Sequence, residues 1–246
     1  MTAALGLPRR GFVAPGPYLL GHLLLVPLLL GLAALAIQHG PLDLALARLF
    51  ADPVTHTFSL RGSRLLDLIG HEAARGLPIV IGVVGFAAGL CGLRYAPLKP
   101  WAPILISLGL SILLGPVLVN LLKGMTTQHC PNALDLFGGS LSYDADRAAP
   151  FWAASRETAG RCLPSGHASG GYALLSLYFA GWAAGRPEWR WSGLAIGIGA
   201  GLVFSIVRML QGAHFASATV WSAAVDWTVC AAVFYPLLCR RPGPPR

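Results

Sequence analysis

Long apolar stretches alternate with shorter polar ones along this chain of 246 residues. A helix needs about 20 mostly apolar residues to cross the hydrocarbon core of a bilayer, and six stretches come close to that length. The predicted spans are residues 18–37, 77–93, 101–122, 167–184, 191–210 and 217–238. We therefore expect an all-α membrane protein in which six transmembrane helices form one bundle, with residues 1–246 as a single domain.

The segments between the predicted spans differ in length. Two are long, 38–76 and 123–166, and an even count of spans between them would place both on the same side of the membrane. Within the first, residues 42–50 and 65–71 have the pattern of short amphipathic helices. Such helices bury one face in the membrane interface, so we expect both to lie on the membrane surface near the long loops.

The distribution of charge predicts the orientation. The short connections and the two tails hold nine basic residues and one acid, in 1–17, 94–100, 185–190 and 239–246. The long loops contain both signs in similar number. Because basic loops are retained in the cytoplasm, both termini are predicted to be cytoplasmic. In a bacterial inner (cytoplasmic) membrane the long loops would then face the periplasm.

The composition agrees with a membrane protein. The chain is 55% hydrophobic and 11% charged, whereas soluble domains carry roughly 25% charged residues. The net charge of +8 does not indicate a nucleic-acid partner, because the basic residues flank apolar runs. Membrane lipids are the expected surroundings.

Cysteine placement predicts one disulfide. Cys130 and Cys162 both fall in the second long loop, and an extracytoplasmic location is oxidising. We predict that they pair, the alternative being two unpaired cysteines that act as small apolar residues. Cys91, Cys230 and Cys239 lie within or at the cytoplasmic ends of spans and are expected to be free thiols.

The first candidate functional motif is Pro164-Ser165-Gly166-His167, at the start of the fourth predicted span. A helix N-terminus offers unpaired N–H groups and the positive end of the helix dipole, so it can bind an anion. Ser165 adds a hydroxyl donor, Gly166 permits close approach, and His167 lies within reach. The alternative is an ordinary N-cap serine followed by an interfacial histidine.

A second candidate group lies at the ends of neighbouring spans. Arg208 ends the fifth span and His214 begins the sixth. A guanidinium fork suits a tetrahedral oxyanion, and a histidine beside it can act as a nucleophile. Lys123 ends the third span, and Arg161 beside Cys162 is another candidate phosphate ligand. The alternative for the cations is that they extend toward lipid head groups. In a compact bundle these residues would share one outer pocket.

These motifs, in this order, resemble the type 2 phosphatidic acid phosphatase (PAP2) superfamily of membrane phosphatases, which is related to the vanadium haloperoxidases. Its signature is Lys-x6-Arg-Pro, Pro-Ser-Gly-His and Ser-Arg-x5-His-x3-Asp. Lys123 begins the first motif, residues 164–167 match the second, and Arg208 and His214 have the spacing of the third. The resemblance covers about residues 120–227.

The resemblance implies a two-step phosphoryl transfer without a metal or cofactor. His214 would attack phosphorus and become a phosphohistidine. His167 would protonate the leaving oxygen and then activate water. Four groups would stabilise charge on the phosphoryl oxygens: Lys123, Arg208, Ser165 and the main chain of Gly166.

Val207 stands where the family serine would, and two further departures from the family pattern matter more. Cys130 replaces the arginine of the first motif, and Arg161 is the candidate to take over its role. Ala218 replaces the aspartate four residues after His214, on the same helical face. Alanine cannot hold an imidazole in one tautomer. Asp226, twelve residues after His214, lies about 18 Å further along the helix and is no substitute. Either the chain is inactivated at Ala218, or another group orients His214.

We therefore expect a membrane lipid phosphatase that acts on a phosphomonoester or diphosphate of a lipid at the periplasmic face. Undecaprenyl diphosphate, lipid A phosphate and phosphatidylglycerol phosphate are candidate substrates, because a site at the interface favours an amphiphile. The alternatives are a lipid phosphotransferase with the same intermediate, and a catalytically dead lipid-phosphate binding protein. The sequence leaves the oligomeric state open.

Overall fold

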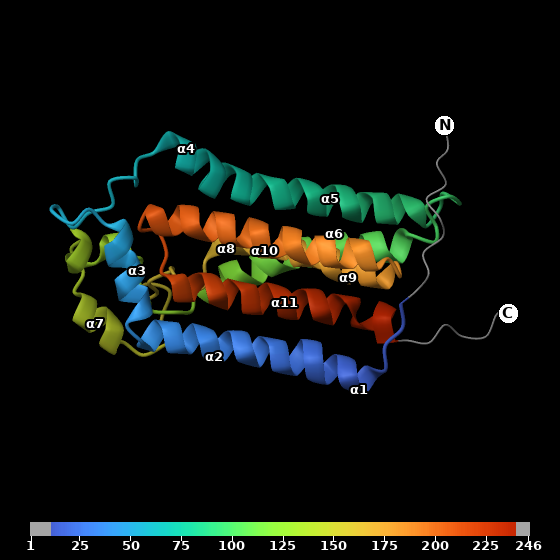
Figure 1. Cartoon of the computed structure of the whole chain (residues 1–246), viewed down its shortest axis with the longest axis horizontal. Helices are drawn as coiled ribbons and strands as arrows, with labels where there is room; N and C mark the ends of the chain where they lie inside the picture. Colours follow the sequence, from blue (N-terminus) through green and yellow to red (C-terminus); the bar gives the residue numbers. More distant parts are fainter. Residues whose placement is uncertain (1–10, 240–246) are drawn as a thin grey trace.

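The computed structural model describes residues 11–239, so the predicted cytoplasmic tails lie mostly outside it. The described chain is an all-helical bundle without a strand. Its long helices run roughly along the long axis of the molecule (Figure 1). This confirms an all-α fold.

Five helical segments are long and apolar enough to cross a membrane: Pro15–His39, Arg64–Gly92, Ala102–Lys123, Pro187–Leu210 and Ala216–Cys239. The first comprises α1 (Pro15–Tyr18), η1 (Leu19–Leu25) and α2 (Val26–His39), and the second comprises α4 (Arg64–Asp67), η2 (Leu68–Ala73) and α5 (Ala74–Gly92). The others are α6 (Ala102–Lys123), α10 (Pro187–Leu210) and α11 (Ala216–Cys239). The chain is accordingly a multi-pass membrane protein.

The fourth predicted span is broken into three short pieces: α8 (Gly166–Tyr172), η5 (Ala173–Leu175) and α9 (Ser176–Ala183). Most of its residues are buried, because α10, α11 and α6 pack around it. Close contact with α10 depends on small residues. A Cβ atom on Gly197 would lie 2.6 Å from the main chain of Leu175. This segment is therefore central in the bundle, and the six-span count stays a prediction.

The prediction of a separate surface helix at residues 65–71 was wrong. These residues form the start of the second spanning segment, which begins at Arg64 rather than near residue 77. Gly70 lies close against α10, and a Cβ atom there would lie 2.5 Å from the side chain of Val207. The η2 part of the segment thus packs against α10, while α4 is mostly exposed. The other predicted short helix is present as α3 (Leu42–Phe50).

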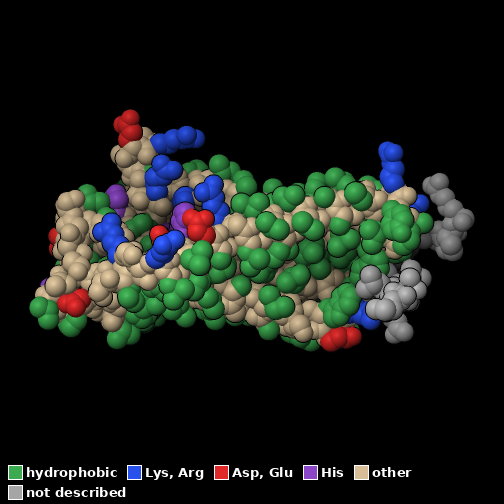
Figure 2. Space-filling view, turned by 90° about the horizontal axis from the view of Figure 1, so that it is seen from above, with side chains coloured by type: hydrophobic (Ala, Val, Ile, Leu, Met, Phe, Trp, Pro, Cys, Tyr) green, Lys and Arg blue, Asp and Glu red, His purple; other side chains and the backbone are tan. Residues whose placement is uncertain are grey.

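The two ends of the bundle differ. At one end α1 begins and α11 finishes, and the Val13 N–H donates to the Leu238 carbonyl at 2.9 Å. The helices α3, α4 and α7 (Tyr143–Ala148) gather at the other end (Figure 1). Hydrophobic side chains cover most of the length between them. Charged side chains and histidine collect at the end that carries α3 and α7 (Figure 2). An apolar belt between two polar ends is the pattern of a membrane-embedded bundle.

The main hydrophobic core lies toward the end where α11 finishes. It is aromatic, and it joins Tyr18, Phe179, Trp227 and Phe234 from three spanning or buried segments. A smaller cluster around Phe58, Phe137 and Phe215 sits under the loops at the opposite end. The second cluster fixes the loops over the bundle.

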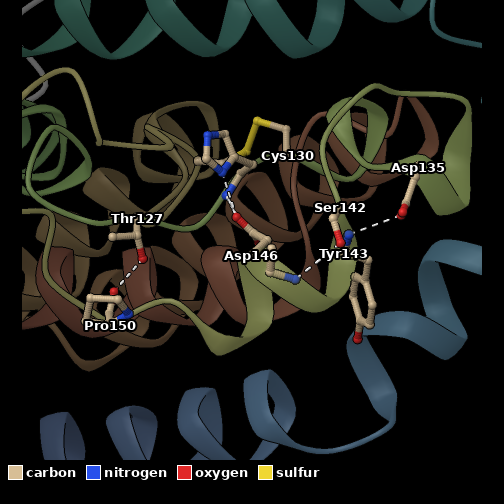
Figure 3. A network of polar contacts seen from close by, with 10 residues as sticks. Thr127, Cys130, Asp135, Ser142, Tyr143, Asp146 and Pro150 are labelled. Atoms are coloured by element: carbon tan, nitrogen blue, oxygen red, sulfur yellow. Dashed lines mark hydrogen bonds and ion pairs between the residues drawn. A yellow bond between two sulfur atoms is a disulfide. The ribbon is translucent and has the colours of Figure 1, made fainter.

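The loop 123–166 is a folded cap. It contains η3 (Pro131–Ala133), η4 (Asp135–Phe137) and α7. The structure forms the predicted disulfide between Cys130 and Cys162, with their Cα atoms 5.2 Å apart. Cys91, Cys230 and Cys239 are free, as predicted. A polar network around Asp146 braces the cap (Figure 3), and it includes the His129 Nδ1 at 2.6 Å.

Candidate active site

The structure brings the two predicted catalytic histidines together. His167 lies in the first turn of α8, and His214 lies between α10 and α11. Their ring centroids are 5.8 Å apart. The charges of Arg208 and Lys123 are close enough to act on both rings. Residues from four parts of the chain therefore come close together at the end of the bundle that carries α3 and α7.

Lys123 points over the start of α8. A Cβ atom placed on Gly166 would lie 3.6 Å from the Lys123 Nζ. The ammonium group therefore adds positive charge where the unpaired N–H groups of the α8 N-terminus begin. The main chain at Gly166 has no side chain to shield it. An anion can approach both groups at once.

Ser165 is the N-cap of α8. Its hydroxyl accepts from the Ala168 N–H at 3.3 Å, and its own N–H donates to the Ala218 carbonyl at 3.0 Å. The Ser165 carbonyl accepts from the Ser222 hydroxyl at 2.8 Å. These bonds anchor the start of α8 to α11. They also leave the hydroxyl proton of Ser165 available to an anion, so the cap and the predicted phosphate contact are compatible.

Arg208 is held in place by its neighbours. One terminal nitrogen donates to Gln211 Oε1 at 2.8 Å and lies 3.7 Å from the carboxylate of Asp67. Among the described residues, Arg208 Nε and His167 Nδ1 are buried and have no hydrogen-bond partner in the protein. Buried polar groups are normally paired. A phosphate between them would supply the missing partner.

His214 sits after a tight turn that only glycine can make. Gly212 has φ +64°, and a Cβ atom there would lie 2.1 Å from the ring of Phe58. The imidazole is 7% exposed, and its Nδ1 lies 3.0 Å from the Cys162 carbonyl oxygen. A carbonyl can only accept, so Nδ1 carries the proton. The Nε2 lone pair of His214 is then free to attack phosphorus.

Burial and neighbouring positive charges keep the His214 imidazole neutral. Burial lowers the pKa of His214 to about 3, although the hydrogen bond to the Cys162 carbonyl opposes the shift. The positive charges of Arg208 and Lys123 lower the pKa further. A neutral imidazole is the form that can act as a nucleophile.

No carboxylate occupies the position of the family aspartate. Ala218 is 1% exposed, and the nearby Ser217 and Thr219 hydroxyls bind Asp43 and the Ala216 carbonyl instead. Asp226 is fully buried and its carboxylate lies against Gly115 on α6, away from His214. The main-chain oxygen of Cys162 is the hydrogen-bond acceptor beside His214 Nδ1. Sequence reasoning missed it, because a carbonyl acceptor leaves no trace in residue identity.

Arg161 is more exposed than the other candidate phosphate ligands. It is exposed, has φ +61°, and lines a surface hollow with Trp152 and Arg156. Its charge still acts on Lys123. Cys130 cannot replace the family arginine, because its sulfur is bonded to Cys162. Phosphate binding by Arg161 stays a prediction, with the rim of the pocket as its place.

Asp43 on α3 was not predicted to matter. It is 5% exposed, and its carboxylate accepts from the Ser217 N–H at 2.9 Å and from the Ser217 hydroxyl. Burial raises the pKa of Asp43, while these hydrogen bonds lower it. The residue holds the first turn of α11, directly after His214. An acid within the apolar run 42–50 was the available signal.

The donor atoms of Cys130, Cys162 and His214 lie within 4.8 Å of one another. A metal site of this type needs thiolates, and here the two sulfurs are bonded to each other. In the disulfide form these residues therefore do not provide a set of thiolate ligands.

The sequence model of the PAP2 superfamily matches residues 104–238, more than half of the chain. The matched stretch contains Lys123, the α8 N-terminus, Arg208 and His214. The chain belongs to the PAP2 superfamily. Proteins of this family generally hydrolyse phosphate esters. No curated protein and no solved structure matches the chain.

Proposed function

We propose that this PAP2 protein is a lipid phosphatase that works through a phosphohistidine at His214. The observation that carries the proposal is the relation of His214 to His167. The two rings are 5.8 Å apart, and the hydrogen bond from Nδ1 to Cys162 leaves Nε2 of His214 unprotonated. The cations of Lys123 and Arg208 stand beside both rings.

In the first step Nε2 of His214 attacks phosphorus and the ester P–O bond breaks. Burial and the charge of Arg208 lower the pKa of His167 to about 2, and the bound anion opposes this shift by favouring the protonated form. The protonated His167 gives its proton to the leaving oxygen. In the second step His167 takes a proton from water, and the oxygen attacks phosphorus while the P–N bond breaks. Inorganic phosphate leaves and His214 returns to the neutral imidazole. Lys123, Arg208 and the α8 N-terminus stabilise the equatorial oxygens. The steps call for no metal.

A groove beside the site supports a lipid substrate. A cavity of about 460 Å³ lies between α5, α6 and α8 and reaches His167. The polar part of its wall includes His71, Arg75, Asn120, Lys123 and His167. The apolar part includes Ile79, Ile112, Leu113 and Val117. A phosphate head with a hydrocarbon chain matches this division. Undecaprenyl diphosphate, lipid A phosphate and phosphatidylglycerol phosphate all have that form.

The proposed location is a bacterial inner membrane, with both termini in the cytoplasm and the site at the periplasmic face. Two observations support it. The site lies at the opposite end of the bundle from the beginning of α1 and the end of α11 (Figure 1). The disulfide in the cap is of the kind that persists in oxidising compartments.

The test is release of inorganic phosphate by the purified protein in lipid bicelles. The panel would contain a glycerophospholipid phosphomonoester, a prenyl diphosphate and lipid A phosphate. We expect release from at least one substrate, a phosphoryl group on His214 after alkaline quenching, and no activity in His214→Ala. His39→Ala is the matched control, because His39 is exposed and lies outside the pocket.

The same assay separates the alternatives. Transfer of phosphate to a second lipid, with no free phosphate, would identify a phosphotransferase. Binding without turnover would identify a dead lipid-phosphate binding protein and end the phosphatase proposal. The contact of His214 with the Cys162 carbonyl favours an enzyme over a dead protein, since Ala218 does not leave the imidazole without an acceptor.

A further inference from the structure

The acceptor of His214 belongs to a covalently linked pair. His214 Nδ1 lies 3.0 Å from the main-chain oxygen of Cys162, and the Cys162 side chain, 2% exposed, is bonded to Cys130. The Cys162 sulfur also lies 3.4 Å from the same Nδ1 atom. The imidazole of His214 therefore contacts the disulfide itself.

The other half of the bridge reaches the same turn. Two residues after Cys130, the Asn132 N–H donates to the Gly212 carbonyl at 3.0 Å. Gly212 stands two residues before His214. The disulfide thus joins two chain segments that each hold the turn 211–214, one at Gly212 and one at His214. Movement of either segment relative to the other would change the direction of the imidazole.

Each of the two cysteines is connected with a position at which the chain departs from the family pattern. Cys130 occupies the position of the first-motif arginine, and the Cys162 carbonyl makes the contact that Ala218 cannot make. One covalent link therefore occupies the first of these motif positions and holds the group that contacts His214 in place of the second. This coincidence would have no explanation if the disulfide served only to brace the loop.

We propose that Cys162 is a positioning residue whose carbonyl, held by the disulfide to Cys130, fixes the tautomer and direction of His214 in place of the family aspartate. The inference rests on the proposed role of His214 as nucleophile. It makes turnover dependent on the redox state of the pair. A dithiol reductant would supply two electrons and two protons, leaving two cysteine thiols and an oxidised reductant.

Reduction should loosen the contact without opening the cap. The Cys162 N–H still donates to the Gln128 carbonyl at 3.2 Å, and the Thr126 hydroxyl still donates to the Leu163 carbonyl. Loss of fine alignment in an otherwise intact site can cost about 100-fold in rate. We therefore expect kcat to fall by up to about 100-fold while KM changes little, because Lys123 and Arg208 do not depend on the bridge.

The experiment compares three proteins in bicelles: the oxidised chain, the same chain after reduction, and a Cys130→Ser/Cys162→Ser variant. Phosphate release gives kcat and KM. Binding of orthovanadate, which can accept a bond from His214 Nε2, is compared with binding of inorganic phosphate. Cys91→Ser is the control for loss of an exposed thiol. A chelator is present throughout, because two free thiols and His214 within 4.8 Å would form metal ligands.

The proposal expects lower kcat and at least 10-fold weaker vanadate binding after reduction and in the double variant, with phosphate binding unchanged. Adding Ala218→Asp to the double variant should recover part of the lost rate. Full kcat and full vanadate affinity without the disulfide would overturn the proposal. If the double variant does not fold, the reduced chain provides the test. Unchanged phosphate binding then shows that the reduced chain is still folded.

Failure of the proposed function can be recognised separately. If the oxidised chain releases no phosphate from any substrate, the phosphatase proposal fails. Vanadate binding then still tests the positioning: redox-dependent affinity supports it, and equal affinity in both states overturns it.

Discussion

The carboxylate of Asp43, on α3, binds both the main-chain N–H and the hydroxyl of Ser217 in the first turn of α11. The two residues are 174 positions apart in the chain. Through this contact a short helix outside the bundle fixes the start of the helix that follows His214. The site therefore depends on a residue that touches neither histidine.

Replacing Asp43 should destabilise the fold. In Asp43→Ala the buried Ser217 donors lose their acceptor, and hydrogen bonds to a charged group are worth about 2 kcal/mol. We expect the free energy of unfolding, measured by denaturant titration in mild detergent, to fall by roughly that amount. Asp144→Ala removes an exposed carboxylate from α7 and is the control. Equal stability of the two variants would contradict the role of Asp43.

The low pKa of His214 has a consequence for acid pH. Since burial lowers the pKa to about 3, the imidazole should stay neutral as the pH falls through 6.5, where an ordinary histidine becomes protonated. We expect the ¹⁵N resonances of labelled His214, assigned by comparison with His214→Ala, to be constant between pH 7 and 5. A change centred near pH 6.5 would show that the ring is solvated and not held as described.

Arg208 should dominate anion affinity. Its buried Nε has no partner among the described residues, and a charge-assisted hydrogen bond contributes about 1.5–3 kcal/mol. We expect Arg208→Ala to weaken inorganic phosphate binding by at least about 10-fold in calorimetry. Arg48→Ala, an exposed change on α3, should leave the affinity unaltered. Comparable loss in both variants would point to a general effect of net charge.

The groove between α5 and α6 should select for a lipid chain. Val117 lines its apolar wall, whereas the adjacent Leu118 does not. We expect Val117→Trp to raise KM for a lipid phosphate by about 10-fold or more and to leave hydrolysis of a short soluble phosphate ester unchanged. Leu118→Trp is the matched control on the same helix. Equal loss for both substrates would mean that the bulky side chain disturbs the site itself.

Much of the fold could be predicted from the sequence because spans are a matter of local composition. Hydrophobic length placed five spanning segments, and the spacing of Lys123, residues 164–167, Arg208 and His214 indicated one pocket. The start of the second span was misplaced because residues 64–76 contain polar side chains, although packing of Gly70 on α10 keeps them in the helix. The break after Tyr172 depends on contacts with α10, which a local pattern does not contain.

The orientation of His214 could not be predicted for a different reason. Motif reasoning looks for a side chain at position 218, and a main-chain carbonyl can come from any residue. The disulfide was predicted from the location of Cys130 and Cys162 in one loop. Its contact with His214 required the three-dimensional course of that loop.

The packing of α2 against α11 also bears on biosynthesis. These helices lie side by side (Figure 1), yet three other spanning segments lie between them in the chain, so α2 leaves the ribosome well before α11. The leucines of α2 must therefore face lipid, without their main helical neighbour, until α11 has been synthesised. His214 directly precedes α11, so a nascent chain should bring His214 beside His167 only after α11 has been synthesised.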